Sequence, residues 1–183
     1  MEMMAGVHDH EAWIKQSPNY FKDADPLAPC DMGFIPKGSV SFCYVYLTPH
    51  LFKAAGADLA LPDPKYFSKA MSFCEALPKD DSDRLTCFGS FGKEFVVLAS
   101  ARNVQKVSDM TNEGHPTIYE WCILGPKEGL TPCLDSALHS IYCGGEQTPR
   151  AAIRFFSYIP EHTRSHLLMR SLFGAVSSTF QHD

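Results

Sequence analysis

The chain has 183 residues, a formal net charge of −5, 45% hydrophobic residues and 20% charged residues. This composition is typical of a chain that folds around a buried core, and it argues against intrinsic disorder. It contains no Lys/Arg run of the kind that nucleic-acid binders carry, and no apolar stretch approaches the roughly 20 residues that a membrane-spanning helix needs.

The first segment, residues 1–29, is expected to be a loosely structured arm with a short helix around Trp13. It lacks the basic stretch followed by an apolar stretch that marks a secretory signal. The remaining residues, 30–183, are expected to form one folded domain.

The next segment, residues 39–47, alternates apolar and polar positions, which is also compatible with a strand. Residues 48–55 continue at helical period, however, and a helix through both segments accounts for more of the pattern. We therefore favour a helix here.

Two helices joined by a turn are expected further along. Apolar residues recur at helical spacing in residues 65–77 and again in residues 85–98. Pro78 ends the first helix, and the polar residues 79–83 supply a turn and an N-cap. Gly89 and Gly92 lower the helix propensity of the second helix, which suggests that they allow close approach of a neighbouring backbone.

The C-terminal part repeats this arrangement. Thr131 is expected to cap a helix with Pro132 at its first position, and Gly144-Gly145 is expected to end it. Pro149 then begins the next helix.

The seven cysteines are spaced regularly. Twelve residues lie between Cys30 and Cys43, twelve between Cys74 and Cys87, and ten between Cys122 and Cys133. The second and third pairs share the pattern C-x-x-x-P-K-acid, and the first pair has a stretched version of it that ends in Pro36-Lys37. Cys143 is left over as a free thiol.

Each cysteine pair with the residues around it is interpreted as one copy of a repeated unit. A fourth copy of this unit lies 82 residues after the second. In it the first and second cysteines are matched by Phe156 and Met169, two apolar residues that could fill the same space between helices. Six identities support the alignment; they are Ala152, Phe155, Pro160, Leu167, Phe173 and Gly174, matching Ala70, Phe73, Pro78, Leu85, Phe91 and Gly92.

The predicted fold is therefore all-α. It is an irregular array of about four helix-turn-helix hairpins, either α-solenoid-like or a compact helical bundle, with units that start near residues 30, 74, 122 and 156. The three cysteine pairs, Cys30–Cys43, Cys74–Cys87 and Cys122–Cys133, are interpreted as disulfides that staple the hairpins.

Two other interpretations of the cysteines stay open. The first is that the cysteines are reduced residues of the core, as in many cytoplasmic proteins. The second is that they bind zinc, but gaps of ten and twelve residues do not resemble zinc-ligand spacing. Disulfides favour an extracytoplasmic location, either periplasmic or secreted, and the cytoplasm is the alternative.

Two further sets of residues are candidates for chemistry. His162, His166 and Met169 follow i, i+4, i+7 spacing and could bind a metal or a haem iron, although a core methionine beside partly solvated histidines is the favoured explanation. Cys143 and His139 are four residues apart, as a thiol enzyme would need, but a C-terminal helix position raises a thiol pKa.

No catalytic residue is assigned and no cofactor is expected. The preferred function is a non-enzymatic helical-repeat binding or scaffold module whose partner is another protein or a peptide. Tyr44, Tyr46 and Tyr119 are possible contact residues and equally possible core residues. The alternatives are a metal or haem carrier and a thiol enzyme.

Overall fold

The computed structural model describes residues 21–22, 24–31, 35–58, 63–79, 81–99, 114–143, 149–165 and 168–173. Within these ranges the chain is all-α, as predicted, and contains no strand beyond one isolated bridge between Lys22 and Asp25. No helix in these ranges is both long and apolar enough to cross a membrane. The predicted N-terminal helix around Trp13 lies outside them.

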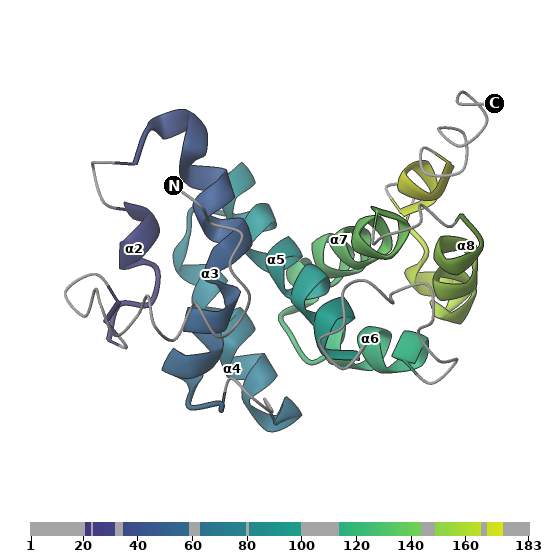
Figure 1. Ribbon diagram of the computed structural model, residues 1–183, viewed down its shortest axis with the longest axis horizontal. Helices are drawn as coiled ribbons and strands as arrows, with labels where there is room; N and C mark the ends of the chain where they lie inside the picture. The colour runs from purple at the N-terminus through teal and green to yellow at the C-terminus, as the bar shows by residue number, and fades with distance from the viewer. Residues whose placement is uncertain are drawn as a thin grey trace. The chain divides into compact units, whose positions relative to one another are not determined.

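The α-helices in chain order are α2 (Ala28–Asp31), α3 (Val40–Ala55), α4 (Phe67–Ser72), α5 (Ser82–Ala99), α6 (Gly114–Cys122), α7 (Leu130–Cys143) and α8 (Pro149–Tyr158). Short 3-10 helices adjoin several of them: η1 (Lys37–Ser39), η2 (Pro64–Tyr66), η3 (Phe73–Ala76), η5 (Lys127–Gly129) and η6 (Glu161–Thr163). Residues 168–173 are also helical. Figure 1 shows these helices along the chain.

Most of the predicted helices are confirmed. The ambiguous segment from residue 39 is helix α3, which ends at Gly56, where a φ of 103° gives the left-handed C-cap that glycine adopts readily. Helix α5 covers the predicted residues 85–98 and begins three residues earlier, at Ser82. The predicted cap at Thr131 is wrong, because a 3-10 turn after Pro126 starts the helix at Leu130.

The prolines of the four predicted units all lie at hairpin turns. The carbonyl of each accepts a backbone hydrogen bond from the residue three positions on, with N···O distances of 2.7 Å at Pro36, 3.1 Å at Pro78 and 2.8 Å at both Pro126 and Pro160. Because proline has no backbone N–H, it interrupts the preceding helical segment, and its carbonyl accepts the hydrogen bond that opens the turn. The predicted repeat that starts near residue 74 differs from the others, because no 3-10 helix follows Pro78 in the described residues.

Two arginines close their turns in the same way. The Arg84 Nη1 donates to the carbonyls of Glu75 and Leu77, at 2.7 Å each. Arg164 donates from Nε to the carbonyl of Ile159 at 2.8 Å and from Nη2 to that of Ser157 at 3.2 Å. The two acceptors in the fourth unit stand 82 residues after those in the second, which is the offset of the predicted copy.

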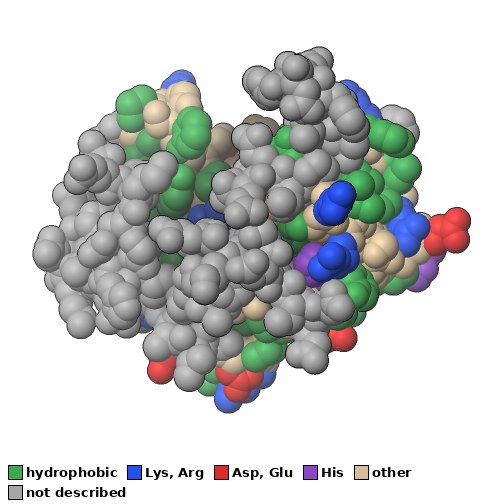
Figure 2. Space-filling model, turned by 45° about the vertical axis from the view of Figure 1, so that its right-hand side comes forward, with side chains coloured by type: hydrophobic (Ala, Val, Ile, Leu, Met, Phe, Trp, Pro, Cys, Tyr) green, Lys and Arg blue, Asp and Glu red, His purple; other side chains and the backbone are tan. Residues whose placement is uncertain are grey.

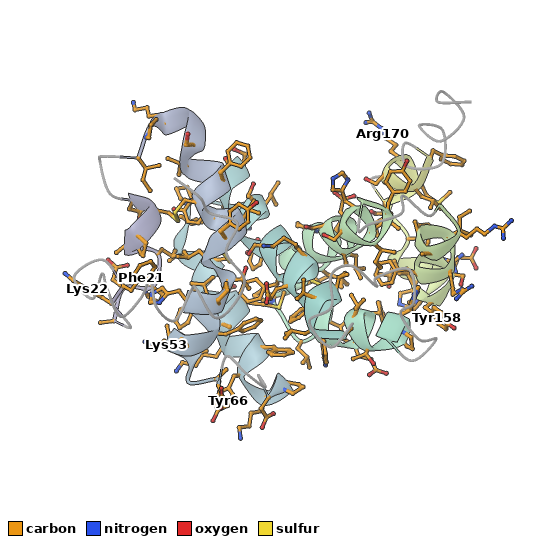
Figure 3. All side chains as sticks on the ribbon, viewed as in Figure 1. Phe21, Lys22, Lys53, Tyr66, Tyr158 and Arg170 are labelled. Atoms are coloured by element: carbon orange, nitrogen blue, oxygen red, sulfur yellow. A yellow bond between two sulfur atoms is a disulfide. The ribbon has the colours of Figure 1, made fainter. Side chains whose placement is uncertain are left out.

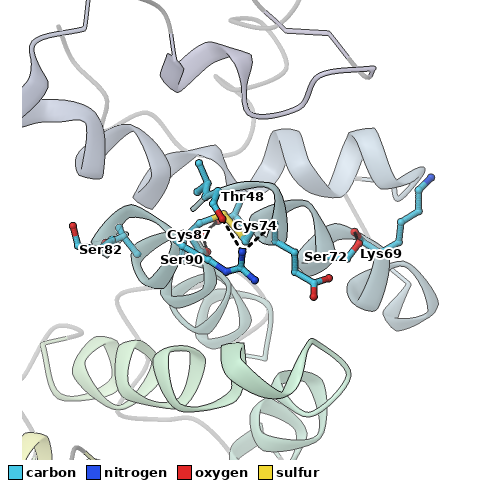
Figure 4. Close-up of a disulfide and its surroundings, with 11 residues drawn as sticks. Thr48, Lys69, Ser72, Cys74, Ser82, Cys87 and Ser90 are labelled. Atoms are coloured by element: carbon cyan, nitrogen blue, oxygen red, sulfur yellow. Dashed lines mark hydrogen bonds between the residues drawn. A yellow bond between two sulfur atoms is a disulfide. The ribbon is translucent and has the colours of Figure 1, made fainter. Parts of the chain in front are cut away.

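Three disulfides join the predicted cysteine pairs in the part of the chain that the structure describes. The Cα–Cα distances are 5.5 Å for Cys30–Cys43, 5.7 Å for Cys74–Cys87 and 5.8 Å for Cys122–Cys133. Each links the two arms of one hairpin. Figure 4 shows the second disulfide with Thr48 and Ser90 nearby.

The chain divides into two compact units, Met1–Ser90 and Phe91–Asp183, with the boundary inside α5. In the first unit α3 packs on α4, and the rings of Phe52 and Phe67 lie 5.1 Å apart. Thr48 Oγ1 donates to Ser90 Oγ at 2.7 Å, and Ser41 donates to Asp83, so two side-chain hydrogen bonds also join α3 to α5.

The second unit is built from the C-terminal part of α5 with α6, α7 and α8. Its buried aromatic side chains include Phe91, Phe95 and Phe155, and the rings of Phe95 and Trp121 lie 5.5 Å apart. Gly92 of α5 meets the backbone of α7, since a Cβ there would fall 2.7 Å from the carbonyl carbon of Cys133. The close approach predicted for this glycine is confirmed.

Candidate binding face

Helix α8 has one buried and one exposed side. The buried residues recur at helical spacing, so this side packs into the Phe91–Asp183 unit; they are Ala151, Ala152, Phe155 and Phe156, and Ile159 directly after the helix is buried as well. The other side is exposed and combines basic, apolar and aromatic residues: Arg150, Ile153, Arg154, Ser157 and Tyr158. We call these five exposed residues the α8 face.

The α8 face is organised as a ridge. Arg150, Arg154 and Tyr158 follow i, i+4, i+8 spacing and therefore line up along the helix. Ile153 beside them is 48% exposed and Tyr158, at the end of α8, is 38% exposed; Figure 3 labels Tyr158 there. Neither arginine forms an ion pair with any residue that the structure describes.

A buried histidine lies directly behind this ridge. His115 in the first turn of α6 is 1% exposed, and its ring meets the rings of Phe155 at 6.0 Å and Tyr158 at 5.8 Å in edge-to-face geometry. No hydrogen-bond partner for its buried Nδ1 is found among the residues described. Burial, with a smaller contribution from the positive charge of Arg154, lowers the pKa of His115 to about 4.

His115 should therefore make the stability of the fold depend on pH. Its pKa is about 4 in the folded chain against about 6.5 in the unfolded chain, so the unfolded state binds a proton first as the pH falls and the fold loses about 2 kcal/mol between pH 7 and pH 5. The loss continues until the pH falls below about 4, where the folded state is protonated as well. Denaturant unfolding across this range, compared with His115→Gln, measures it; an equal pH dependence in the variant would contradict the assignment.

The residue types of the α8 face are ones that are common in protein–protein interfaces. Arginine and tyrosine are enriched where proteins bind one another, because they combine a large apolar contact with directional hydrogen bonds. Figure 2 shows Lys and Arg side chains standing among hydrophobic ones on one face of the molecule. The arrangement suits the binding of a chain segment across a helix surface.

Sequence reasoning missed both parts of this site. The helical alternation of apolar and exposed positions in residues 149–159 was available as a signal for the α8 face. His115 carried no local signal, because its burial depends on packing between α6 and α8.

The predicted metal trio is not on one continuous helix. His162 is exposed in η6, which ends at Arg164 with a ψ of 89°, and Met169 lies beyond this break in the helical residues 168–173. The i, i+4, i+7 argument for a shared face is therefore wrong. His166 lies outside the described residues, so the metal site stays a prediction. No group of three or more His, Cys, Asp or Glu suited to a metal occurs in the ranges described.

The predicted thiol pair lies on one helix. His139 is exposed on α7, and Cys143 is the last residue of that helix. The side chain of Cys143 lies outside what the structure describes, so its role as a free thiol or nucleophile stays a prediction.

The three tyrosines suggested as contact residues differ in exposure. Tyr44 is buried and donates a hydrogen bond to Asp31 at 2.9 Å, and burial, followed by this hydrogen bond, raises the pKa of its phenol. It is therefore a core residue, which is one of the two alternatives that the sequence left open for it. Tyr46 and Tyr119 are half-buried.

Fold and site together define an all-α protein of disulfide-linked helical hairpins with one exposed basic and apolar helix face. No protein-family model, curated protein or solved structure matches the chain.

Proposed function

We propose that this chain is a non-enzymatic helical-repeat binding module, that it binds a protein or peptide through the α8 face, and that it works in an oxidising, extracytoplasmic compartment. The observation that carries the proposal is the α8 face itself. Ile153 and Tyr158 are exposed next to two arginines that have no ion-pair partner among the described residues. A surface helix that serves only the fold usually shows polar residues on its outer side.

The contacts behind the α8 face support a binding role, because they fix the position of helix α8. The Arg164 side chain fixes the C-terminal end of α8 through the carbonyls of Ser157 and Ile159, and its guanidinium lies 5.2 Å from the centre of the Phe156 ring. A face that is already ordered loses less conformational entropy when a partner binds.

The regular hairpin turns support the helical-repeat part of the proposal. The hydrogen bonds at the four prolines recur at corresponding positions of the predicted units. The carbonyls that the two arginines bind correspond as well, although the arginines themselves do not. Stacked helical hairpins expose extended surfaces, and such surfaces commonly bind other chains.

The disulfides support the proposed compartment. Structural disulfides persist in oxidising environments and are rare in the cytoplasm, where thiols are kept reduced. Cys74, Cys87, Cys122 and Cys133 are fully buried, as expected of cysteines with a structural role.

Selection from a displayed library of random peptides tests the binding role. Peptides selected on the oxidised protein should lose binding to Ile153→Asp, because the aspartate removes an apolar contact and repels acidic groups. Phe42→Asp is the matched control, since Phe42 is also exposed, at 65%, but lies on α3. Circular dichroism checks that both variants fold. Selected peptides that bind Ile153→Asp as well as the unchanged protein would show that the α8 face is not the binding surface.

A further inference from the structure

Building on the proposed binding role, we infer that the partner of the α8 face is an acidic peptide segment of another protein. Its carboxylates would meet Arg150 and Arg154, and an apolar side chain would contact Ile153 and Tyr158. The argument rests on the distribution of charge and on the two arginines.

Charge is segregated along the chain. Residues 149–173 contain four arginines and one acidic residue, Glu161, so their net charge is 4 − 1 = +3. The whole chain carries −5, which leaves −5 − 3 = −8 for the remaining residues. The basic charge of the C-terminal region is therefore local in an otherwise acidic protein.

Two arginines of this region are available to a partner. Arg150 and Arg154 are exposed on α8 and form no ion pair with other residues of the described ranges. Side chains four residues apart on a helix lie about 5–6 Å from one another at Cβ. Two carboxylates at a similar spacing, such as those of acidic residues one helical turn apart, can therefore engage both guanidinium groups.

The same distribution argues against a membrane surface or a nucleic acid as the partner. Both are extended anionic surfaces whose binding depends on many cationic contacts, and the net charge of −8 outside residues 149–173 opposes them. A short peptide touches only the local basic region, because charges beyond about 8 Å are largely screened at physiological salt. The exposed Ile153 also suits an amphipathic peptide better than a phosphate backbone.

Binding of three designed peptides tests the inference. The probes are labelled 15-residue peptides with leucine at helical spacing and with Glu, Gln or Lys at the remaining contact positions. The Glu peptide should bind most tightly and should weaken as salt increases. Arg150→Gln combined with Arg154→Gln should weaken it about tenfold. Lys127→Gln is the control, because it removes one exposed positive charge from η5 and leaves the α8 face intact.

His115 gives a second readout that a general charge effect would not produce. The positive charge of Arg154 contributes to its low pKa, so a carboxylate bound at Arg154 should raise that pKa. Nuclear magnetic resonance of the histidine ring signals between pH 7 and pH 5, where the carboxylates of the peptide stay ionised, detects the onset of His115 protonation with and without saturating Glu peptide. An unchanged His115 pKa in the saturated complex would overturn the placement of the carboxylate at Arg154.

The remaining outcomes separate this inference from the proposed function. If the Glu and Gln peptides bind equally well, and if neither binds the Ile153→Asp variant, the acidic partner is overturned and the binding role of the α8 face stands. If none of the three designed peptides binds, and if no peptide selected from the library depends on Ile153, both the acidic partner and the proposed binding role are overturned. Binding to phosphatidylserine vesicles but not to the Glu peptide would also overturn the inference and would indicate a lipid surface.

Discussion

Reduction of the disulfides is expected to unfold the chain at ordinary temperature. The bonds close loops with sequence separations of 13, 13 and 11 residues. The chain-entropy model assigns about 3 kcal/mol to each loop of this size, and the sum of about 9 kcal/mol is comparable to the roughly 5–15 kcal/mol by which native domains are stable. Circular dichroism during thermal unfolding, with and without dithiothreitol, measures the effect.

A single disulfide can be removed without a reductant. Cys122→Ala together with Cys133→Ala should lower the unfolding midpoint by about 6–12 °C, because it removes about 3 kcal/mol from a chain of this size. Mass-spectrometric mapping of unreduced, alkylated protein is the control that identifies the joined cysteines. Free thiols at all seven positions, together with a midpoint insensitive to reductant, would show that the cysteines are reduced core residues.

Gly92→Ala is expected to destabilise the fold by about 3 kcal/mol, as overpacking at a rigid contact does. The new Cβ would fall 2.7 Å from the carbonyl carbon of Cys133 and 2.9 Å from the nitrogen of Ala137. Both are backbone atoms of α7, which cannot rotate away as a side chain can. Urea unfolding, followed by helical circular dichroism, measures the change.

The sign of this effect is informative. Helix propensity alone predicts that Gly→Ala inside a helix such as α5 stabilises it by about 1 kcal/mol. The matched control is Gly38→Ala, where nothing lies within 4 Å of the new Cβ and where stability should stay the same or rise slightly. A stabilising Gly92→Ala would mean that α5 and α7 do not approach as closely as the structure shows.

The candidate site was only partly accessible from local patterns. The helical alternation in residues 149–159 allows the exposed side of α8 to be predicted, but it does not show that His115 lies behind Tyr158. Nor does it show that Arg150 and Arg154 lack acidic neighbours among the described residues. Those facts depend on how α6 packs on α8, and His115 is 40 residues from Phe155 and 43 from Tyr158 in the sequence.

The metal trio illustrates a different limit. Spacing of i, i+4, i+7 places residues on one face only if the helix is continuous, and here the backbone leaves helical geometry at Arg164. The carbonyls that Arg164 binds, those of Ser157 and Ile159, belong to the preceding arm. The helix is therefore interrupted at the residue whose side chain binds the preceding arm, and the spacing of apolar residues does not reveal this interruption.

By itself, the sequence determined that the chain is all-α, which cysteines pair, and where prolines turn the hairpins. These features follow from interactions over a few residues, namely helical periodicity, the missing backbone N–H of proline and the short loops between paired cysteines. Tertiary structure alone decided that Tyr44 is buried, that Gly92 meets the backbone of Cys133, and that His115 lies behind the α8 face. The physical reason is that burial and electrostatic environment are set by packing between segments far apart in the chain, where local patterns carry no information.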